Sequence, residues 1–167
     1  MGINQLKIRP CELRDERLLL QWRNDPEAIR WSQSGRAVGS EEHSAWFRSS
    51  LSSSSVQIFI GFYPDLDPER VGEDCLGMVR FDHAPEASSV SIYIKPAARS
   101  QGVAKELLSS GIRLLAAKPE ETLVLLAFVH DGNSASQQLF SSAGFEFDGR
   151  VGEFARLKKR VQAISNA

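Results

Sequence analysis

Cysteine is scarce in this chain of 167 residues, and the two cysteines present argue against several kinds of site. Cys11 and Cys75 stand far apart, with no C-x-x-C motif and no spacing typical of metal ligands. A disulfide-stabilised secreted domain and a metal site are therefore both disfavoured, and no metal is expected. The two thiols are predicted to be reduced residues of the core.

An excess of one charge and a long apolar run are also lacking. The 20 Lys and Arg nearly balance the 21 Asp and Glu, giving a net charge of −1, so no basic surface for nucleic acid is indicated. No apolar run approaches the ~18 residues of a membrane span, and the opening MGINQLKIRP has no apolar signal core. We therefore expect a cytoplasmic protein that binds neither nucleic acid nor membrane. Its length predicts one domain over 1–167, with a core at 6–157 and a frayed tail at 158–167.

A strand, a short turn and a helix are indicated between residues 90 and 117. Apolar and polar side chains alternate up to Pro96, which has no N–H to donate, and this period is typical of a half-buried strand. The alternating residues are Val90, Ser91, Ile92, Tyr93, Ile94 and Lys95. In the helix that follows, a stripe at three- and four-residue steps is predicted to face a core. The stripe consists of Ala104, Leu107, Leu108, Gly111, Leu114 and Leu115.

The turn between this strand and helix predicts an anion site. It consists of Arg99, Ser100, Gln101, Gly102, Val103 and Ala104. A turn with small residues that opens directly into a helix points several unpaired N–H groups at one spot, and the helix dipole and Arg99 strengthen that site for an anion. The turn has neither G-x-x-x-x-G-K-[ST] nor G-x-G-x-x-G, which excludes a Walker phosphate loop and a dinucleotide fingerprint.

A second strand and helix follow. The continuous apolar run 123–129 predicts a central strand that is buried on both faces. Asn133 is placed to cap the next helix, and Gly144 is placed to end it. The predicted packing stripe of that helix is Ala135, Leu139, Phe140 and Ala143.

These two segments together resemble the GCN5-related N-acetyltransferases (GNAT). The turn is similar to the pyrophosphate loop of that family, in which an arginine is followed by two residues, a glycine, one residue and a small residue; here these are Arg99, Gly102 and Ala104. The second helix matches the family pattern N-x-x-S-x-x-L-[FY]-x-x-x-G-F at Asn133, Ser136, Leu139, Phe140, Gly144 and Phe145. The resemblance implies an α/β (α+β) acyl-CoA N-acyltransferase fold. Its central sheet is mixed and mostly antiparallel, with about six or seven strands and about four helices.

The resemblance also implies acetyl-CoA as co-substrate and direct attack of an amine on its thioester. The diphosphate of the coenzyme is then expected on the N–H groups of residues 100–104 beside Arg99, and its pantetheine arm along the open edge of the strand at Ile92, Tyr93, Ile94 and Lys95. Asn133, Ser136 and Phe140 are the expected contacts from the second helix. The chain departs from the family at two positions, because Phe140 replaces a tyrosine that can protonate the thiolate and Ser89 replaces a glutamate that can act as base.

The remaining elements are predicted from shorter patterns. A short edge strand spans 6–10, and a helix capped by Asp15 runs through Trp22 until Pro26 stops it. A further helix begins at Ser40 as its cap, with one face formed by His43, Trp46, Phe47 and Leu51. Strands follow at 57–62 and 75–82, with a turn-rich connection at 65–74, and two final strands lie at 145–151 and 153–157.

The acceptor is suggested by a narrower resemblance. LxIRP at 6–10, WRND at 22–25, EHxxWF at 42–47 and GMVRFD at 77–82 are similar to the acetyltransferases of bacterial pseudaminic acid biosynthesis, which acetylate a nucleotide-linked amino sugar. That resemblance places six residues on the acceptor side, with His43 as the candidate base. They are Arg23, Asn24, His43, Trp46, Arg80 and Asp82.

Other interpretations stay open from the residues alone. His43 and Trp46 also fit a packed helix face, and Arg80 with Asp82 also fits a solvated pair. The acceptor is alternatively a protein N-terminus, a polyamine or an antibiotic amine, since one fold serves many acceptors. The missing tyrosine and glutamate are also compatible with a non-catalytic module that binds acyl-CoA. Whether the chain forms a homodimer is left open.

Overall fold

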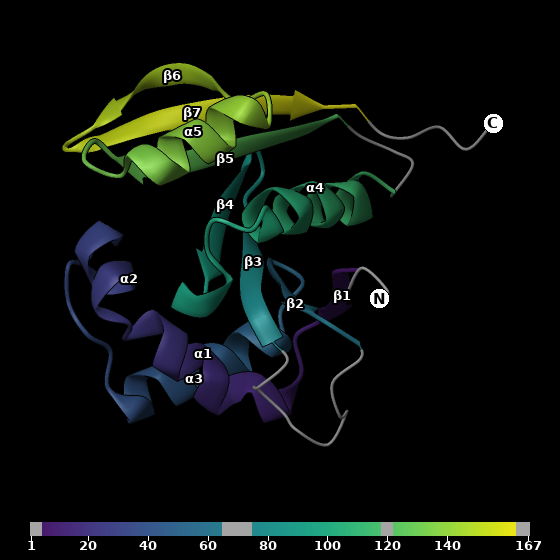
Figure 1. The fold of residues 1–167 in the computed structure, drawn as a ribbon, viewed down its shortest axis with the longest axis vertical. Helices are drawn as coiled ribbons and strands as arrows, with labels where there is room; N and C mark the ends of the chain where they lie inside the picture. The colour runs from purple at the N-terminus through teal and green to yellow at the C-terminus, as the bar shows by residue number, and fades with distance from the viewer. Residues whose placement is uncertain (1–4, 65–74, 118–121, 163–167) are drawn as a thin grey trace.

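The computed structural model of the chain describes residues 5–64, 75–117 and 122–162. They form one seven-stranded sheet in the order β1-β2-β3-β4-β5-β7-β6 (Figure 1). The strands are β1 (Lys7–Pro10), β2 (Val56–Phe62), β3 (Cys75–His83), β4 (Ser88–Ile94), β5 (Leu123–His130), β6 (Glu146–Val151) and β7 (Phe154–Val161). The helices are α1 (Glu16–Arg23), α2 (Pro26–Trp31), α3 (Ser40–Leu51), α4 (Val103–Ala116) and α5 (Ser134–Ser142), with 3₁₀ turns η1 (Leu13–Asp15) and η2 (Pro96–Ala98). The predicted mixed, mostly antiparallel sheet is confirmed.

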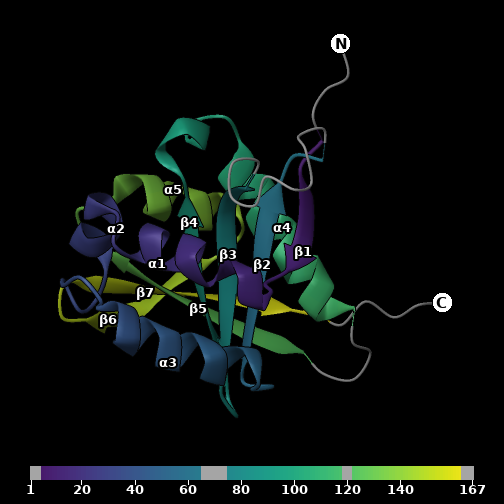
Figure 2. The same ribbon diagram turned by 90° about the horizontal axis from the view of Figure 1, so that it is seen from below.

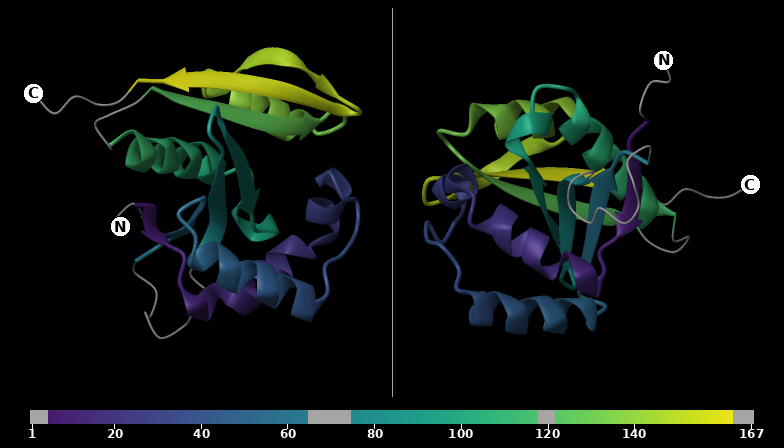
Figure 3. Two further views of the ribbon diagram at one scale, coloured as in Figure 1. Left: turned by 180° about the vertical axis from the view of Figure 1, so that it is seen from behind. Right: turned by 60° about the horizontal axis from the view of Figure 1, so that its bottom comes forward.

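The sheet divides into two parts between β4 and β5. All neighbouring strands pair antiparallel except β4 and β5, which pair parallel at Ser88↔Leu125 and Ser89↔Leu126 and then diverge. In Figure 3 the C-terminal part, coloured green to yellow, is set apart from the N-terminal part. Because parallel strands run in the same direction, the gap between β4 and β5 widens toward the C-terminal ends of both strands.

Helices cover both faces of the sheet. α1 and α3 lie across one face of the N-terminal part, and α4 lies behind the other face (Figure 2). The apolar core between α4 and the sheet includes Val79, Phe81, Leu107 and Leu108, and α5 extends it over β5 and β7. At Gly111 an added Cβ would lie 2.8 Å from Val79 Cγ1, so a glycine is needed where α4 approaches β3. No helix in the described part of the chain is long and apolar enough to span a membrane.

The N-terminal helices differ from the prediction at their ends. Pro26 does not simply stop the first helix, because it also begins α2, a helix that the sequence analysis missed. Proline is favoured at the first helical position, where no N–H is needed, and the Asp25 side chain caps α2 by accepting from the Glu27 N–H at 2.9 Å. Ser40 is the first residue of α3 rather than its cap. Leu51 is 37% exposed, so it does not share the buried face of His43 and Phe47.

Three other packing predictions are wrong. In α4, Leu114 is 45% exposed, while Val103 and Ile112 are buried. In α5, Ala135 is exposed, although Phe140 is buried as predicted. β5 alternates buried and half-buried residues, so it is fully buried on one face only.

The C-terminal residues up to Val161 are part of the sheet, contrary to the predicted frayed tail. β7 pairs with β5 along its whole length, from His130↔Phe154 to Leu123↔Val161. The polar sequence of Lys158 to Arg160 suggested a free end, but backbone pairing in a sheet does not require apolar side chains on both faces. Residues 163–167 and the predicted connection at 65–74 lie outside the described residues. Cys11 and Cys75 form no disulfide, and Cys75 is buried whereas Cys11 is half-buried.

Asp15, predicted as a helix cap, instead forms a buried ion pair. Its fully buried carboxylate accepts from Arg9 Nη1 at 2.7 Å, from Arg9 Nη2 at 2.8 Å and from the Glu12 N–H at 2.8 Å. Burial alone would raise the pKa of Asp15, but the hydrogen bonds from Arg9 and Glu12 outweigh it and lower the pKa below its ordinary value. The pair ties β1 to the start of α1.

We expect Asp15→Asn to lower the free energy of unfolding by about 3 kcal/mol at pH 7, because it leaves the Arg9 guanidinium without its counter-charge. Since the folded pKa is depressed, the contribution of Asp15 is complete above the unfolded pKa near 4 and is lost as the pH falls through the folded value. Urea unfolding at pH 7 and at pH 3 measures both effects. Arg14→Gln, which breaks the exposed pair with Glu12, is the control and is expected to cost less than about 1 kcal/mol. Equal losses in the two variants at pH 7 would contradict this role for Asp15.

Candidate functional site

The gap between β4 and β5 leaves one backbone edge of β4 unpaired by the sheet. Residues from Val90 to Ile94 pair with β3, while pairing with β5 ends at Ser89. The predicted coenzyme residues Ile92, Tyr93 and Ile94 lie on this segment, with Lys95 directly after it. An exposed strand edge offers alternating N–H and C=O groups to an extended ligand. The arrangement suits the amide-rich arm of a coenzyme, and its use stays a prediction.

The turn after β4 places the predicted anion loop at the start of α4. Gly102 precedes the helix with φ +79°, and Ser100 also has a positive φ of 60°. Glycine adopts this left-handed conformation without strain, which explains its place at the helix start. The first N–H groups of α4, from Val103 onward, have no partner within the helix and point out of its end. Gln101 donates its side-chain Nε2 to Ala97 O at 2.9 Å and so steadies the turn.

Arg99 does not extend freely from this loop. Its Nε donates to Ile94 O at 2.9 Å, its Nη1 donates to the Glu27 carboxylate, and its Nη2 lies 3.8 Å from Asp25 Oδ1. The guanidinium carbon is 5.8 Å from the centre of the Tyr93 ring. The loop is therefore joined to α2 by charge. Sequence reasoning missed Asp25 and Glu27, because their partner lies more than 70 residues away in the chain.

A cavity of about 310 Å³ lies between α1 and the end of β4. It is lined by Leu18, Gln21, Trp22, Asp25, Tyr93, Lys95 and Pro96. The Tyr93 ring lies 5.4 Å from the Trp22 ring, and burial and the hydrogen bond to Asp25 raise the pKa of the Tyr93 phenol. A raised pKa makes Tyr93 a poorer proton donor, so it does not replace the missing tyrosine of α5.

The α5 residues predicted to contact coenzyme lie on the other side of the gap. Asn133 caps α5 as predicted, because its Oδ1 accepts from the Ser136 N–H at 3.1 Å. Phe140 is 3% exposed and packs edge-to-face on Phe145, with ring centres 5.1 Å apart. Phe140 is therefore part of the core and supplies no proton.

The acceptor-side residues of β3, Arg80 and Asp82, share one face of the sheet with two serines of β4. Arg80 pairs in register with Ser91, and Asp82 pairs with Ser89, the position where the family often has glutamate. Arg80 Nε donates to Asp82 Oδ2 at 2.8 Å, and the Arg80 guanidinium lies 5.3 Å from the centre of the Trp46 ring. The structure thus brings Trp46 of α3 to the pair on β3.

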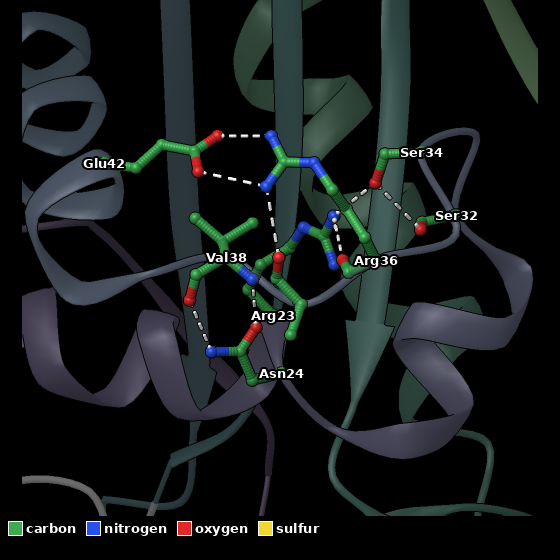
Figure 4. A network of polar contacts seen from close by, with 8 residues as sticks. Arg23, Asn24, Ser32, Ser34, Arg36, Val38 and Glu42 are labelled. Carbon is green, nitrogen blue, oxygen red and sulfur yellow. Dashed lines mark hydrogen bonds and ion pairs between the residues drawn. The ribbon is translucent and has the colours of Figure 1, made fainter.

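Arg23 and Asn24 hold the connection between α2 and α3 (Figure 4). The Asn24 side chain pairs reciprocally with the backbone of Val38, donating to its carbonyl and accepting from its N–H at 2.8 Å each. Arg23 Nη2 donates to Ser34 Oγ at 2.8 Å and to Arg36 O at 3.2 Å, whereas its Nη1 is buried and has no hydrogen-bond partner. Asn24 is therefore occupied by the backbone, and Arg23 keeps one unused donor.

The charged side chains around Arg23 leave one cation in excess. Arg36 forms a bidentate pair with Glu42 at 2.7 and 3.0 Å, and Arg80 is paired with Asp82. Arg23 has no carboxylate among its hydrogen-bond or ion-pair partners in the described structure. Burial, and then the nearby charges of Arg36 and Arg80, lower the pKa of Arg23 despite the opposing effect of Glu42. An anion at Arg23 would relieve this repulsion.

His43 packs between α1 and α3. It is 3% exposed, its ring stacks on Phe47 with centres 5.8 Å apart, and neither ring nitrogen has a hydrogen-bond partner. It borders a cavity of about 350 Å³ that is also lined by Leu13, Arg14, Glu16, Arg17, Leu20 and Ser40. Burial lowers the pKa of His43 below 6.5, because the opposing effect of Glu16 is smaller. The ring is therefore neutral at pH 7 and keeps a lone pair that can accept a proton.

The predicted residues fall into two neighbouring groups, which meet at Tyr93 on the face of the sheet that α1 and α3 cover. Those assigned to coenzyme lie around the open end of the gap between β4 and β5, while Arg23, His43, Trp46, Arg80 and Asp82 gather between α1, α3 and the sheet. No cluster of three or more His, Cys, Asp or Glu side chains suited to a metal ion occurs within the described residues.

Solved acetyltransferases share this fold. Spermidine N-acetyltransferase from Vibrio cholerae, solved with CoA and spermine, gives a TM-score of 0.76 at 13% identity over 95% of this chain and 96% of that one. Aminoglycoside acetyltransferase AAC(6')-Ib in complex with coenzyme A gives a TM-score of 0.75 at 18% identity, over 95% of this chain and 96% of that one. Campylobacter jejuni N-acetyltransferase PseH gives a TM-score of 0.64 at 17% identity, over 93% of this chain and 97% of that one. No curated protein sequence is similar enough to count as a match.

The family follows from the sequence match together with this fold. The family model described as an acetyltransferase (GNAT) domain matches residues 5–146, which span β1 to the start of β6 and include both the loop before α4 and the helix α5. The chain therefore belongs to the GNAT acetyltransferase family.

Proposed function

We propose that this enzyme transfers the acetyl group of acetyl-CoA to the primary amine of an anionic acceptor, the amino group of a nucleotide-linked sugar. The observation that carries the acceptor class is Arg23, a cation with no carboxylate partner and with a buried, unpartnered Nη1. A buried charged donor without a partner is costly, and a phosphate oxygen is the kind of partner that satisfies it.

The same observation argues against a polycationic acceptor. Arg36 is paired with Glu42 and Arg80 with Asp82, so the charge of Arg23 is left without a counter-charge and neither carboxylate is free to bind a cation. Spermine and kanamycin, bound by structural neighbours of this chain, carry several positive charges and would meet like charge here. The Trp46 ring beside Arg80 adds an aromatic face of the kind that a sugar or a nucleobase contacts.

The chemistry needs no covalent enzyme intermediate. Acetyl-CoA, held along β4 with its diphosphate at residues 99–104, presents its thioester near the free edge of β4. The neutral amine attacks the thioester carbonyl, the C–S bond breaks and the coenzyme leaves as thiolate. The thiolate has a pKa near 8 to 9 and takes a proton from water, so Phe140 costs the enzyme little at neutral pH. We assign His43 as the acceptor of the proton lost by the amine, relayed by water because both ring nitrogens are buried.

The first prediction concerns the acceptor. Thiol release from acetyl-CoA is expected with UDP-linked amino sugars and to be at least tenfold lower, in kcat/KM, with spermidine, kanamycin or an N-terminal peptide. Raising the salt concentration is expected to weaken binding of the productive acceptor, because salt screens the long-range attraction between the incoming anion and the site. Turnover of spermidine or kanamycin as fast as the sugar nucleotide would contradict an anionic acceptor. Binding of CoA without turnover of any acceptor would instead support the non-catalytic alternative.

The second prediction concerns Arg23. Arg23→Gln is expected to raise the acceptor KM at least tenfold with little change in the KM of acetyl-CoA, because about 1.5–3 kcal/mol is typical of a hydrogen bond to a charged group. Arg23→Lys keeps the charge and is expected to recover part of the loss. Arg30→Gln removes an exposed cation stacked on Trp31 and is the control. An unchanged acceptor KM in Arg23→Gln would remove the basis for the anionic acceptor.

The third prediction concerns His43. Phenylalanine fits the stacked position against Phe47 but cannot accept a proton, so His43→Phe is expected to lower kcat more than tenfold while CoA affinity is unchanged. The pKa of His43 is lowered, so wild-type kcat/KM is expected to hold steady down to below pH 6.5 and then to fall as the ring is protonated. That acidic limb should vanish in the variant. A His43→Phe enzyme with wild-type rate and pH profile would make His43 a packing residue.

A further inference from the structure

α2 connects the two loops that follow the diverging strands. At its N-terminal end, Glu27 and Asp25 face Arg99 from the loop after β4. At its C-terminal end, the Trp31 ring lies 5.3 Å from the His130 ring, and an added Cβ on Gly132 would lie 3.1 Å from Trp31 Cζ3. Figures 1 and 3 both show α2 beside the end of β5. Since β4 and β5 are parallel, α2 spans the wide end of the gap where the pantetheine arm is expected.

The contact at the N-terminal end occupies the guanidinium that is expected to bind the coenzyme. Arg99 Nε is held by Ile94 O, so the donors left for a ligand are the Nη groups that now face the acids of α2. Asp25 Oδ1 also accepts from the N–H groups of Glu27 and Ala28 at 2.9 and 3.3 Å, and is therefore committed to capping α2. Glu27 has no such second role, and its side chain is half-exposed. Glu27 is the partner that is free to exchange.

We infer that Glu27 competes with the diphosphate of acetyl-CoA for Arg99, and that coenzyme binding releases the N-terminal end of α2 from the loop after β4. The inference rests on the assignment of residues 99–104 to the coenzyme, and thus on the first half of the proposed function. A diphosphate carries more charge than one carboxylate and also meets the N–H groups at the start of α4. The diphosphate therefore displaces the Glu27 carboxylate from Arg99 and repels it.

The exchange reaches the acceptor side through the chain itself. The N-terminal end of α2 directly follows Arg23 and Asn24, and Arg23 is the residue proposed to meet the acceptor anion. Releasing this end of α2 while Trp31 stays against His130 changes the restraint on Arg23 and Asn24. Glu27 is thus a positioning residue for the N-terminal end of α2.

Titration calorimetry with coenzyme A tests the competition directly. Because the pair is partly exposed, Glu27→Gln is expected to tighten binding by about two- to fivefold. Arg99→Gln is expected to weaken binding, and Glu27→Gln in the Arg99→Gln background is expected to change nothing further. Glu41→Gln removes one exposed carboxylate from α3 and controls for net charge. In the steady state, Glu27→Gln should lower the KM of acetyl-CoA without raising kcat.

The outcomes separate this inference from the proposed acceptor. Unchanged or weaker binding in Glu27→Gln overturns the competition, and so does the same tightening in both Arg99 backgrounds. Wild-type affinity in Arg99→Gln also overturns it, because the guanidinium would then not meet the diphosphate. If Glu27→Gln, Arg99→Gln and the double variant bind coenzyme A as expected but UDP-linked amino sugars are not acetylated, the proposed acceptor fails and the inference stands.

Discussion

Parallel pairing of β4 with β5 at only two register positions is the constraint on which the site depends. Every other strand pair is antiparallel and is interrupted at most by one register shift, whereas these two strands separate after Ser89 and Leu126. The separation is stable because each strand has a complete antiparallel partner on its other side and a helix, α4 or α5, packed on its face. A strand edge inside the sheet is thereby exposed without exposing the core.

The gap assigns different physical tasks to the two sides of the molecule. On the coenzyme side, the groups available are largely backbone: the edge of β4 and the N–H groups at the start of α4. On the acceptor side they are side chains, and most are already paired with one another, as Arg80 is with Asp82 and Arg36 with Glu42. Backbone groups suit a ligand common to a whole family, whereas the charge proposed for the acceptor depends on the one side chain left without a counter-charge, Arg23.

The elements predicted correctly are those whose signal is local. The alternation of β4, the small-residue turn and the α4 stripe apart from Leu114 lie within 30 consecutive residues, and the cap and stop of α5 depend on Asn133 and Gly144 alone. α2 was missed because a proline can either stop a helix or begin one. The contact that favours a helix after Pro26, the packing of Trp31 on His130, lies far away in the sequence. The extension of β7 to Val161 was missed because its partner Leu123 is far away in sequence.

The roles of the site residues were harder to predict from the sequence than the helices and strands. Motif matching singled out Arg23, Asn24 and Arg99 as ligand contacts, yet Asn24 is occupied by the backbone of Val38 and Arg99 by Ile94, Asp25 and Glu27. A motif fixes which side chain is present, whereas the partners that occupy it come from distant parts of the chain. Arg23 differs from the other two because one of its donors has no protein partner. The proposed acceptor class therefore rests on which charges the fold leaves unpaired, a property that no segment of the sequence contains by itself.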